Sequence, residues 1–190
     1  MQMIIRKGLI ELIYKDLQEK KIIYLSAPCG WGKTVLLHQI ADFLRSRREE
    51  CVFLHTQEEV GQGLVSATHP KGETEKEAQI FLVDNLEEWL MSGRMEALMN
   101  HIHIGRKENK FILGGRIPLP VQLVPYKICS QISIYGRDKL KYSREELDQM
   151  CDGLSRGNSR EQLRSMYEVC GGMPLLLAVA GDLLEEEGYA

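Results

Sequence analysis

A glycine-rich loop between an apolar run and a helical pattern constrains this chain more than any other feature. Residues 27–34 have the sequence APCGWGKT, which is the phosphate-loop pattern G-x-x-x-x-G-K-[ST] with Ala27 in the first glycine position. The preceding apolar run, residues 21–26, predicts a buried strand, and residues 33–48 have helical periodicity. A chance glycine-rich turn is the alternative, but the order of strand, loop and helix favours a phosphate-binding loop.

The residue types in this loop suit nucleotide chemistry. Gly30 and Gly32 let the backbone curl so that successive N–H groups point at phosphate oxygens. The Lys33 ammonium would bridge the β- and γ-phosphates, and the Thr34 hydroxyl would ligate Mg²⁺. We therefore expect ATP or ADP with Mg²⁺ as cofactors, held by residues 28–35: Pro28, Cys29, Gly30, Trp31, Gly32, Lys33, Thr34 and Val35.

A carboxylate follows the apolar run at residues 80–83. Asp84 at the carboxyl end of a predicted strand would lie where ligands bind in open α/β sheets, and it could hold the Mg²⁺ water shell. A turn-initiating Asp-Asn pair is the alternative interpretation. The next residue is Asn85, whose amide cannot accept a proton from water. If the general base belongs at that position, the chain hydrolyses ATP slowly or not at all.

Two further motifs lie near the ends of predicted elements. Arg116 follows Gly114-Gly115 and could reach a γ-phosphate, with a solvated loop arginine as the alternative. Pro174 follows Gly171-Gly172-Met173 and opens an apolar helix, a position that suits proline without any ligand. Asp84, Asn85 and Arg116 are thus the candidate catalytic residues, and Thr34 and Asp84 are the candidate metal ligands.

Five short apolar runs predict the strands of a mainly parallel sheet. They cover residues 21–26, 51–55, 79–84, 110–114 and 131–135, and they alternate with helical patterns at 7–20, 33–48 and 86–104. The last pattern is interrupted near Ser92-Gly93, residues 56–76 are expected to be mostly loop, and Ser143 to Glu146 matches a capping box. This order predicts a three-layer α/β fold, a nucleotide-binding core over residues 1–137, and a helical segment over 138–190.

Composition excludes several other classes of protein. Lys and Arg number 24 against 27 Asp and Glu, so bulk electrostatics do not favour nucleic-acid binding, and we expect no direct DNA contact. No window approaches the roughly 18 apolar residues of a membrane span. The five cysteines are odd in number and lack C-x-x-C spacing, which indicates reduced thiols in a cytoplasmic protein. His101 and His103 could form a metal pair, but a frayed helix end is favoured.

Taken together, these stretches resemble the nucleotide-binding domain of STAND ATPases, in particular the MalT-type regulators of the LuxR family. The resemblance is carried by SAPCGWGKTVLL, FLVDNLEEW, FILGGRIPLPVQL, ISIYGRDKLKYSREEL and CGGMPLLLAVAG. It implies that Arg116 is a sensor for the γ-phosphate, that Pro174 packs beside the adenine, and that Arg6 and Lys7 lie near the base.

The chain departs from that family in two places. Asn85 stands where a second acidic residue is usual, and residues 56–78 are shorter than the usual helical insertion, so that face of the sheet is expected to be thinly covered. The resemblance further implies a sensor domain and a DNA-binding helix-turn-helix in a longer protein, neither of which is present in this sequence.

Three functions remain open from the sequence. The first is an ATP/ADP-dependent switch of a signal-responsive transcriptional regulator. The second is a small kinase that transfers a phosphoryl group to a small molecule, with Arg156, Arg160 and Arg164 as lid residues. The third is a degenerate scaffold that binds nothing, against which the intact Lys33, Thr34 and Asp84 argue.

Overall fold

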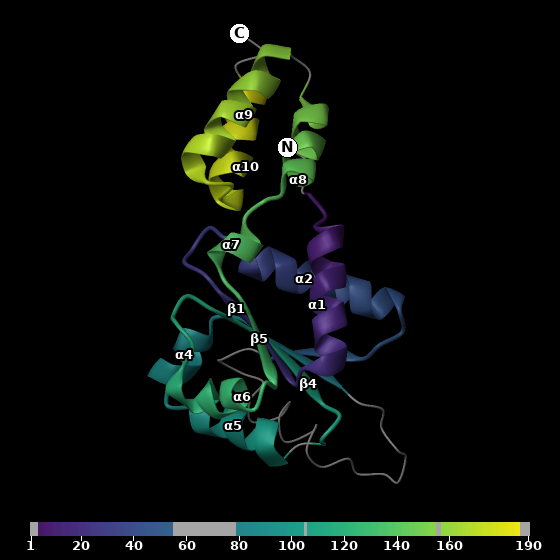
Figure 1. Cartoon of the computed structure of the whole chain (residues 1–190), viewed down its shortest axis with the longest axis vertical. Coiled ribbons are helices and arrows are strands. Elements are labelled where there is room, and N and C mark those ends of the chain that lie inside the picture. Colours follow the sequence, from purple (N-terminus) through teal and green to yellow (C-terminus); the bar gives the residue numbers. More distant parts are fainter. Residues whose placement is uncertain (1–3, 55–78, 105, 155–156, 187–190) are drawn as a thin grey trace.

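A parallel five-stranded sheet between two helical layers forms the body of the protein (Figure 1). The computed structural model describes residues 4–54, 79–104, 106–154 and 157–186. The strand order is β2-β3-β4-β1-β5, and each neighbouring pair is parallel. The strands are β1 (Ile22–Ser26), β2 (Cys51–Leu54), β3 (Ile80–Val83), β4 (Lys110–Gly115) and β5 (Ile132–Tyr135). The predicted parallel α/β architecture is therefore confirmed.

The apolar runs form strands because both faces of the sheet are covered. In β1, Ile22 and Tyr24 point into one hydrophobic core, while Ile23 and Leu25 point into the other. The first core contains side chains of α4 (Leu86–Met91), α5 (Met95–Ile104), η1 (Val121–Leu123) and α6 (Val124–Ile128). The second contains side chains of α1 (Lys7–Glu19) and α2 (Lys33–Ser46). The continuous apolar character of β1 thus serves two cores at once.

The interruption predicted near Ser92-Gly93 separates α4 from α5. Gly93 has a φ of 71°, a left-handed conformation that ends the first helix, and α5 begins two residues later. The short helices η1 and α6 were not predicted. Their sequence, VQLVPYKI, is too short for a helical period to stand out, and Pro125 is tolerated because it lies in the first turn of α6.

Three helices gather at one end of the molecule, beyond the short α7 (Arg137–Leu140) (Figure 1). They are α8 (Arg144–Gly153), α9 (Gly157–Cys170) and α10 (Pro174–Glu186). Their shared core includes Leu147, Met150, Leu163 and Leu177. The predicted capping box is present at the start of α8, where Ser143 and Glu146 each satisfy the other's backbone N–H. The predicted helical segment thus has a hydrophobic core distinct from the two beside the sheet.

The interpretation of residues 101–103 as a frayed helix end is wrong for His101. This ring is 5% exposed and packs edge-on against Phe81 and Phe111, at centroid distances of 4.6 and 5.8 Å. His103 is exposed, and its Nδ1 lies 3.1 Å from the Tyr126 hydroxyl. The periodicity of α5 turns His101 toward the sheet and His103 away from it, so the two do not form a metal pair.

Three other expectations bear on the whole chain. The loop predicted over residues 56–76, and the thin cover of the sheet that it implied, lie outside the described residues. Within the described ranges, no helix combines the length and the apolar character needed to cross a membrane. Nor do three or more His, Cys, Asp or Glu side chains in those ranges form a cluster that could hold a metal ion among themselves.

Candidate functional site

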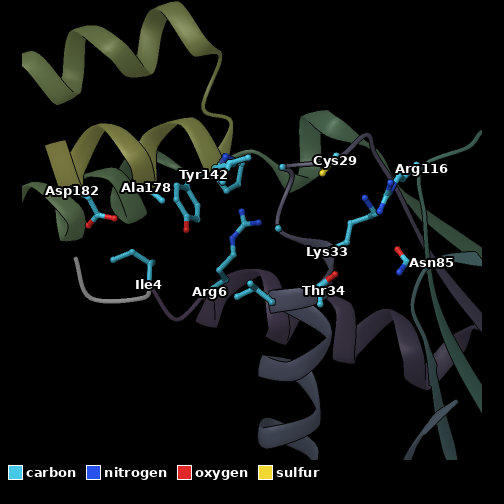
Figure 2. Close-up of a pocket in the computed structure, with 15 residues that line it drawn as sticks. Ile4, Arg6, Cys29, Lys33, Thr34, Asn85, Arg116, Tyr142, Ala178 and Asp182 are labelled. Carbon is cyan, nitrogen blue, oxygen red and sulfur yellow. The ribbon is translucent and has the colours of Figure 1, made fainter. Parts of the chain in front are cut away.

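A pocket of about 450 Å³ lies between the phosphate loop and the helices at the end of the molecule (Figure 2). Figure 2 shows Lys33, Thr34, Asn85 and Arg116 at one end of it, Ile4, Ala178 and Asp182 at the other, and Arg6 and Tyr142 between them. The remaining lining residues are Cys29, Gly30, Gly32, Val35, Pro174 and Leu175. The pocket therefore joins the loop predicted to hold phosphates to a second region, where apolar side chains lie beside Arg6 and Asp182.

The phosphate loop has the backbone that its glycines predict. Gly30 and Gly32 have φ angles of 85° and 73°, in the left-handed region that favours glycine. Lys33 is 7% exposed, and its Nζ donates hydrogen bonds to the carbonyl oxygens of Ala27 at 2.6 Å and Pro28 at 3.0 Å. Burial lowers the pKa of Lys33, while the carboxylates of Asp84 and Glu87 oppose that shift. Negative charge entering the pocket beside Lys33 would favour its charged form.

Oxygen ligands suited to a divalent cation meet at the carboxyl ends of the strands. The Thr34 hydroxyl, in the first turn of α2, donates to Asp84 Oδ2 at 2.5 Å, and Asp84 follows β3 directly. Asp84 Oδ1 accepts the Asn85 N–H at 2.9 Å, and Asn85 has a left-handed φ of 51°. A hydroxyl and a carboxylate beside a phosphate loop fit Mg²⁺, which binds through one or two protein oxygens together with phosphates and water.

Arg116 reaches the pocket because two glycines let β4 pass close to its neighbours. A Cβ at Gly114 would lie 3.1 Å from Asp84 Oδ1, and one at Gly115 would lie 2.7 Å from the Tyr24 hydroxyl. The Tyr24 hydroxyl also donates to the Ile117 carbonyl at 2.7 Å. These contacts fix the chain on both sides of Arg116 and so determine where this arginine enters the pocket.

Glu87 is a residue of this end that the sequence argument missed. It lies in the first turn of α4, three residues after Asp84, and its carboxylate is 3.1 Å from Arg116 Nε. Its Oε2 also accepts the Arg116 backbone N–H at 3.1 Å. An acidic residue in the first turn of a helix is ordinarily explained by the helix dipole, so the sequence carried no distinctive signal for this contact.

The Gly-Met-Pro motif contacts the phosphate loop directly. Leu175 donates its backbone N–H to the Gly30 carbonyl at 3.0 Å. Pro174 lines the pocket, and its Cβ and Cγ would be 3.7 and 3.8 Å from a Cβ at Gly32. The start of α10 therefore rests on the loop, and Pro174 faces the loop's second glycine.

Three residues predicted to bind the nucleotide or its metal, Pro28, Trp31 and Asp84, do not themselves line the pocket. Pro28 is exposed and contributes its carbonyl to Lys33, and Asp84 reaches the pocket through Thr34. Trp31 packs against the core formed with α1 and α2. The other predicted loop residues, Cys29, Gly30, Gly32, Lys33, Thr34 and Val35, line the pocket, as do Asn85, Arg116 and Pro174.

Arg6 joins the far end of the pocket to the rest of the fold. It is 4% exposed and donates to both carboxylate oxygens of Glu146, at 2.9 and 3.2 Å. It also donates to the carbonyls of Leu140 and Lys141, and its guanidinium lies 5.0 Å from the centre of the Tyr142 ring. The resemblance placed both Arg6 and Lys7 near this region, but Lys7 is exposed and does not line the pocket.

Comparisons with solved structures agree with this architecture. The Orc1 protein of Aeropyrum pernix, solved in complex with DNA, is 12% identical to this chain. The match covers 98% of this chain and 62% of the Orc1 chain, with a TM-score of 0.61. The Walker-type ATPase PABY2304 of Pyrococcus abyssi is 13% identical. The match covers 94% of this chain and 67% of that protein, with a TM-score of 0.57. The replication initiator DnaA, solved with AMPPCP and single-stranded DNA, is 14% identical. The match covers 100% of this chain and 66% of the DnaA chain, with a TM-score of 0.54.

These likenesses show the fold alone, a mainly parallel α/β sheet covered by helices on both faces. The chain spans about two thirds of the length of each of these three proteins. Neither the family models nor the curated proteins compared with this sequence gave a match.

Proposed function

We propose that this chain is an ATP/ADP-binding module that acts as a conformational switch, with slow or no intrinsic ATP hydrolysis. The observation that carries the proposal is the pocket itself, in which Lys33, Thr34 and Arg116 lie at one end and Ile4, Ala178 and Asp182 at the other. Its volume of about 450 Å³ falls in the usual range for small-molecule sites. The phosphates would bind at Lys33, and the base would lie against Ile4, Tyr142 and Ala178.

Magnesium would supply charge neutralisation between the phosphates at this site. The Thr34 hydroxyl and the Asp84 carboxylate are the candidate ligands, because they already lie within hydrogen-bond distance of each other beside the loop. Lys33 would turn from the Ala27 and Pro28 carbonyls to the phosphates. Pro28, Cys29, Gly30, Trp31, Gly32 and Val35 complete the loop that we propose around them.

The contact between α10 and the phosphate loop supports the switch. Leu175 bonds the Gly30 carbonyl and Pro174 faces Gly32, so a change in the loop acts directly on the first turn of α10. A nucleotide can shift the arrangement of these helices only by its differential affinity for the two states. ATP and ADP differ at the end of the pocket that holds Asn85 and Arg116, so that difference would originate there.

Slow hydrolysis is proposed from the identity of residue 85. Asn85 lines the pocket at the phosphate end, and its amide cannot take a proton from an attacking water. Asp84, the nearest carboxylate along the chain, is engaged by the Thr34 hydroxyl and the Asn85 N–H. Asp84, Asn85 and Arg116 remain the residues that we propose would govern any residual hydrolysis.

The resemblance to MalT-type regulators extends the proposal to signal-responsive control of transcription. In that role, sensing and DNA contact would belong to other domains of a longer protein and not to this chain. The kinase alternative has no comparable support, because the proposed lid arginines Arg160 and Arg164 do not line the pocket. They bond the Leu154 carbonyl and Asp148 instead, and Arg156 lies outside the described residues.

Calorimetric titration with Mg-ATP and Mg-ADP tests the proposal. The wild-type chain should bind both, and Lys33→Ala should abolish binding because the loop loses the charge that neutralises the phosphates. Lys127→Ala, which removes an exposed lysine from α6, is the matched control and should leave both affinities unchanged. Unchanged affinity in Lys33→Ala would disprove the phosphate-loop assignment, and phosphoryl transfer at kinase rates would disprove the switch.

A further inference from the structure

The ion pair between Glu87 and Arg116 is placed where it can distinguish a triphosphate from a diphosphate. Arg116 lines the pocket and is the more exposed partner, at 53% of its side chain against 18% for Glu87. Two contacts join them, from Nε to Oε1 and from the backbone N–H to Oε2, each at 3.1 Å. The guanidinium can therefore turn toward the pocket, whereas the carboxylate is fixed at the start of α4.

The Arg116 guanidinium compensates the negative charge of the partly buried Glu87 carboxylate. Its Oε1 is buried and accepts no hydrogen bond from the described residues, so the guanidinium charge of Arg116 at 3.1 Å is what compensates it. Leaving such a carboxylate oxygen unpaired carries a desolvation cost. Any ligand that draws the guanidinium away from Glu87 must therefore offset that cost.

The pair lies at the end of the pocket where the phosphates are expected. Arg116 and Lys33 both line that end, and the Glu87 carboxylate contacts the Arg116 Nε at 3.1 Å. A γ-phosphate beside Lys33 would attract Arg116 and repel Glu87. A diphosphate ends before that position and leaves the pair intact.

We propose that Glu87 is the counter-ion that holds Arg116 back from the γ-phosphate, so that it favours ADP over ATP at this site. This inference rests on the proposed nucleotide binding and adds its regulation. Glu87 is a positioning residue: it acts through Arg116, and its loss frees the guanidinium for the triphosphate. The predicted sensor arginine thus starts from a paired state, and the strength of that pair sets the ATP/ADP preference.

Glu87→Gln tests the proposal by titration with Mg-ADP and with Mg-AMPPNP, a triphosphate that is not hydrolysed. The amide keeps the size of the side chain and removes its charge. We expect affinity for the triphosphate to rise about three- to tenfold, the scale of one partly exposed ion pair, with affinity for ADP changed less than twofold. Glu88→Gln, an exposed glutamate on the same helix turn, is the control and should change neither affinity.

Measuring the Glu87→Gln effect in a variant that lacks Arg116 shows whether Glu87 acts through Arg116 or repels the phosphate directly. In Arg116→Gln, the Glu87→Gln effect should largely disappear, because no guanidinium remains to be released. Glu87→Asp, with a shorter carboxylate, should shift the ratio in the same direction but less, and it is the variant to measure if Glu87→Gln does not fold. Binding of ADP reports an intact pocket in every variant.

The outcomes distinguish failure of the counter-ion role from failure of the proposed nucleotide binding. Equal changes for both nucleotides, or weaker triphosphate binding in Glu87→Gln, would overturn the counter-ion role while nucleotide binding stood. An effect that persists fully in Arg116→Gln would overturn it too, since Glu87 would then act on the phosphate directly. A wild-type chain that binds neither nucleotide would overturn both.

Discussion

Removing the Glu146 carboxylate is expected to destabilise the protein far more than removing an exposed carboxylate from the same helix. The Arg6 and Glu146 side chains are 5% and 11% exposed, and they are joined by hydrogen bonds of 2.9 and 3.2 Å. Glu146 Oε2 also accepts the Ser143 N–H at 2.7 Å, which closes the capping box of α8. A single carboxylate therefore serves a buried cation and a helix start.

The expected cost follows from what Glu146→Ala leaves behind. The Arg6 guanidinium would stay buried beside the Tyr142 ring, with the Leu140 and Lys141 carbonyls as the hydrogen-bond acceptors left from its present set. Breaking a buried pair by removing one partner costs about 3–5 kcal/mol, and the lost cap adds about 1 kcal/mol. Because domains are stable by about 5–15 kcal/mol, the melting temperature should fall by about 10 °C or more.

Urea and thermal unfolding, followed by circular dichroism, measure this cost. Asp148→Ala is the control, because the pair between Asp148 and Arg164 has the same 2.9 Å separation but is 59% exposed on both sides, and it should cost less than about 1 kcal/mol. The double variant Arg6→Met/Glu146→Met should recover part of the loss, since no buried charge is then left unpaired. A cost for Glu146→Ala equal to that of the control would refute the reasoning.

Two further predictions concern the site and the core. Asn85→Asp should raise the rate of ATP hydrolysis, because it supplies a carboxylate at the phosphate end and aspartate tolerates the left-handed backbone there. An unchanged rate in a phosphate-release assay would place the base elsewhere. Burial lowers the pKa of His101 from its ordinary value of 6.5, so the unfolded state binds the proton more tightly and stability should fall as the pH drops below 6.5. The fall in melting temperature between pH 7 and pH 5 should be smaller in His101→Leu, and equal slopes would show that His101 does not contribute.

The positions of the predicted loop, Asp84 and Arg116 near one edge of the sheet were predictable because these residues follow local rules. The loop lies between a strand and a helix that each have their own apolar pattern, and Asp84 and Arg116 each follow a buried strand. Parallel strands end at one edge of the sheet, so residues after different strands meet there. Their exact partners were not predictable, because Glu87 and Arg116 are 29 positions apart and belong to different elements.

The sequence by itself determined the five strands, the glycine-rich loop between β1 and α2, and the capping box of α8, since each depends on residues within a few positions of one another. Only the tertiary structure decided the far end of the pocket. Arg6 reaches Glu146 across 140 positions, and Leu175 reaches Gly30 from the other end of the chain. It also decided that His101 is buried, because burial depends on which face of α5 meets Phe81 and Phe111. The physical reason is the same in each case: hydrophobic periodicity reports that a face will be covered, and packing between distant elements selects what covers it.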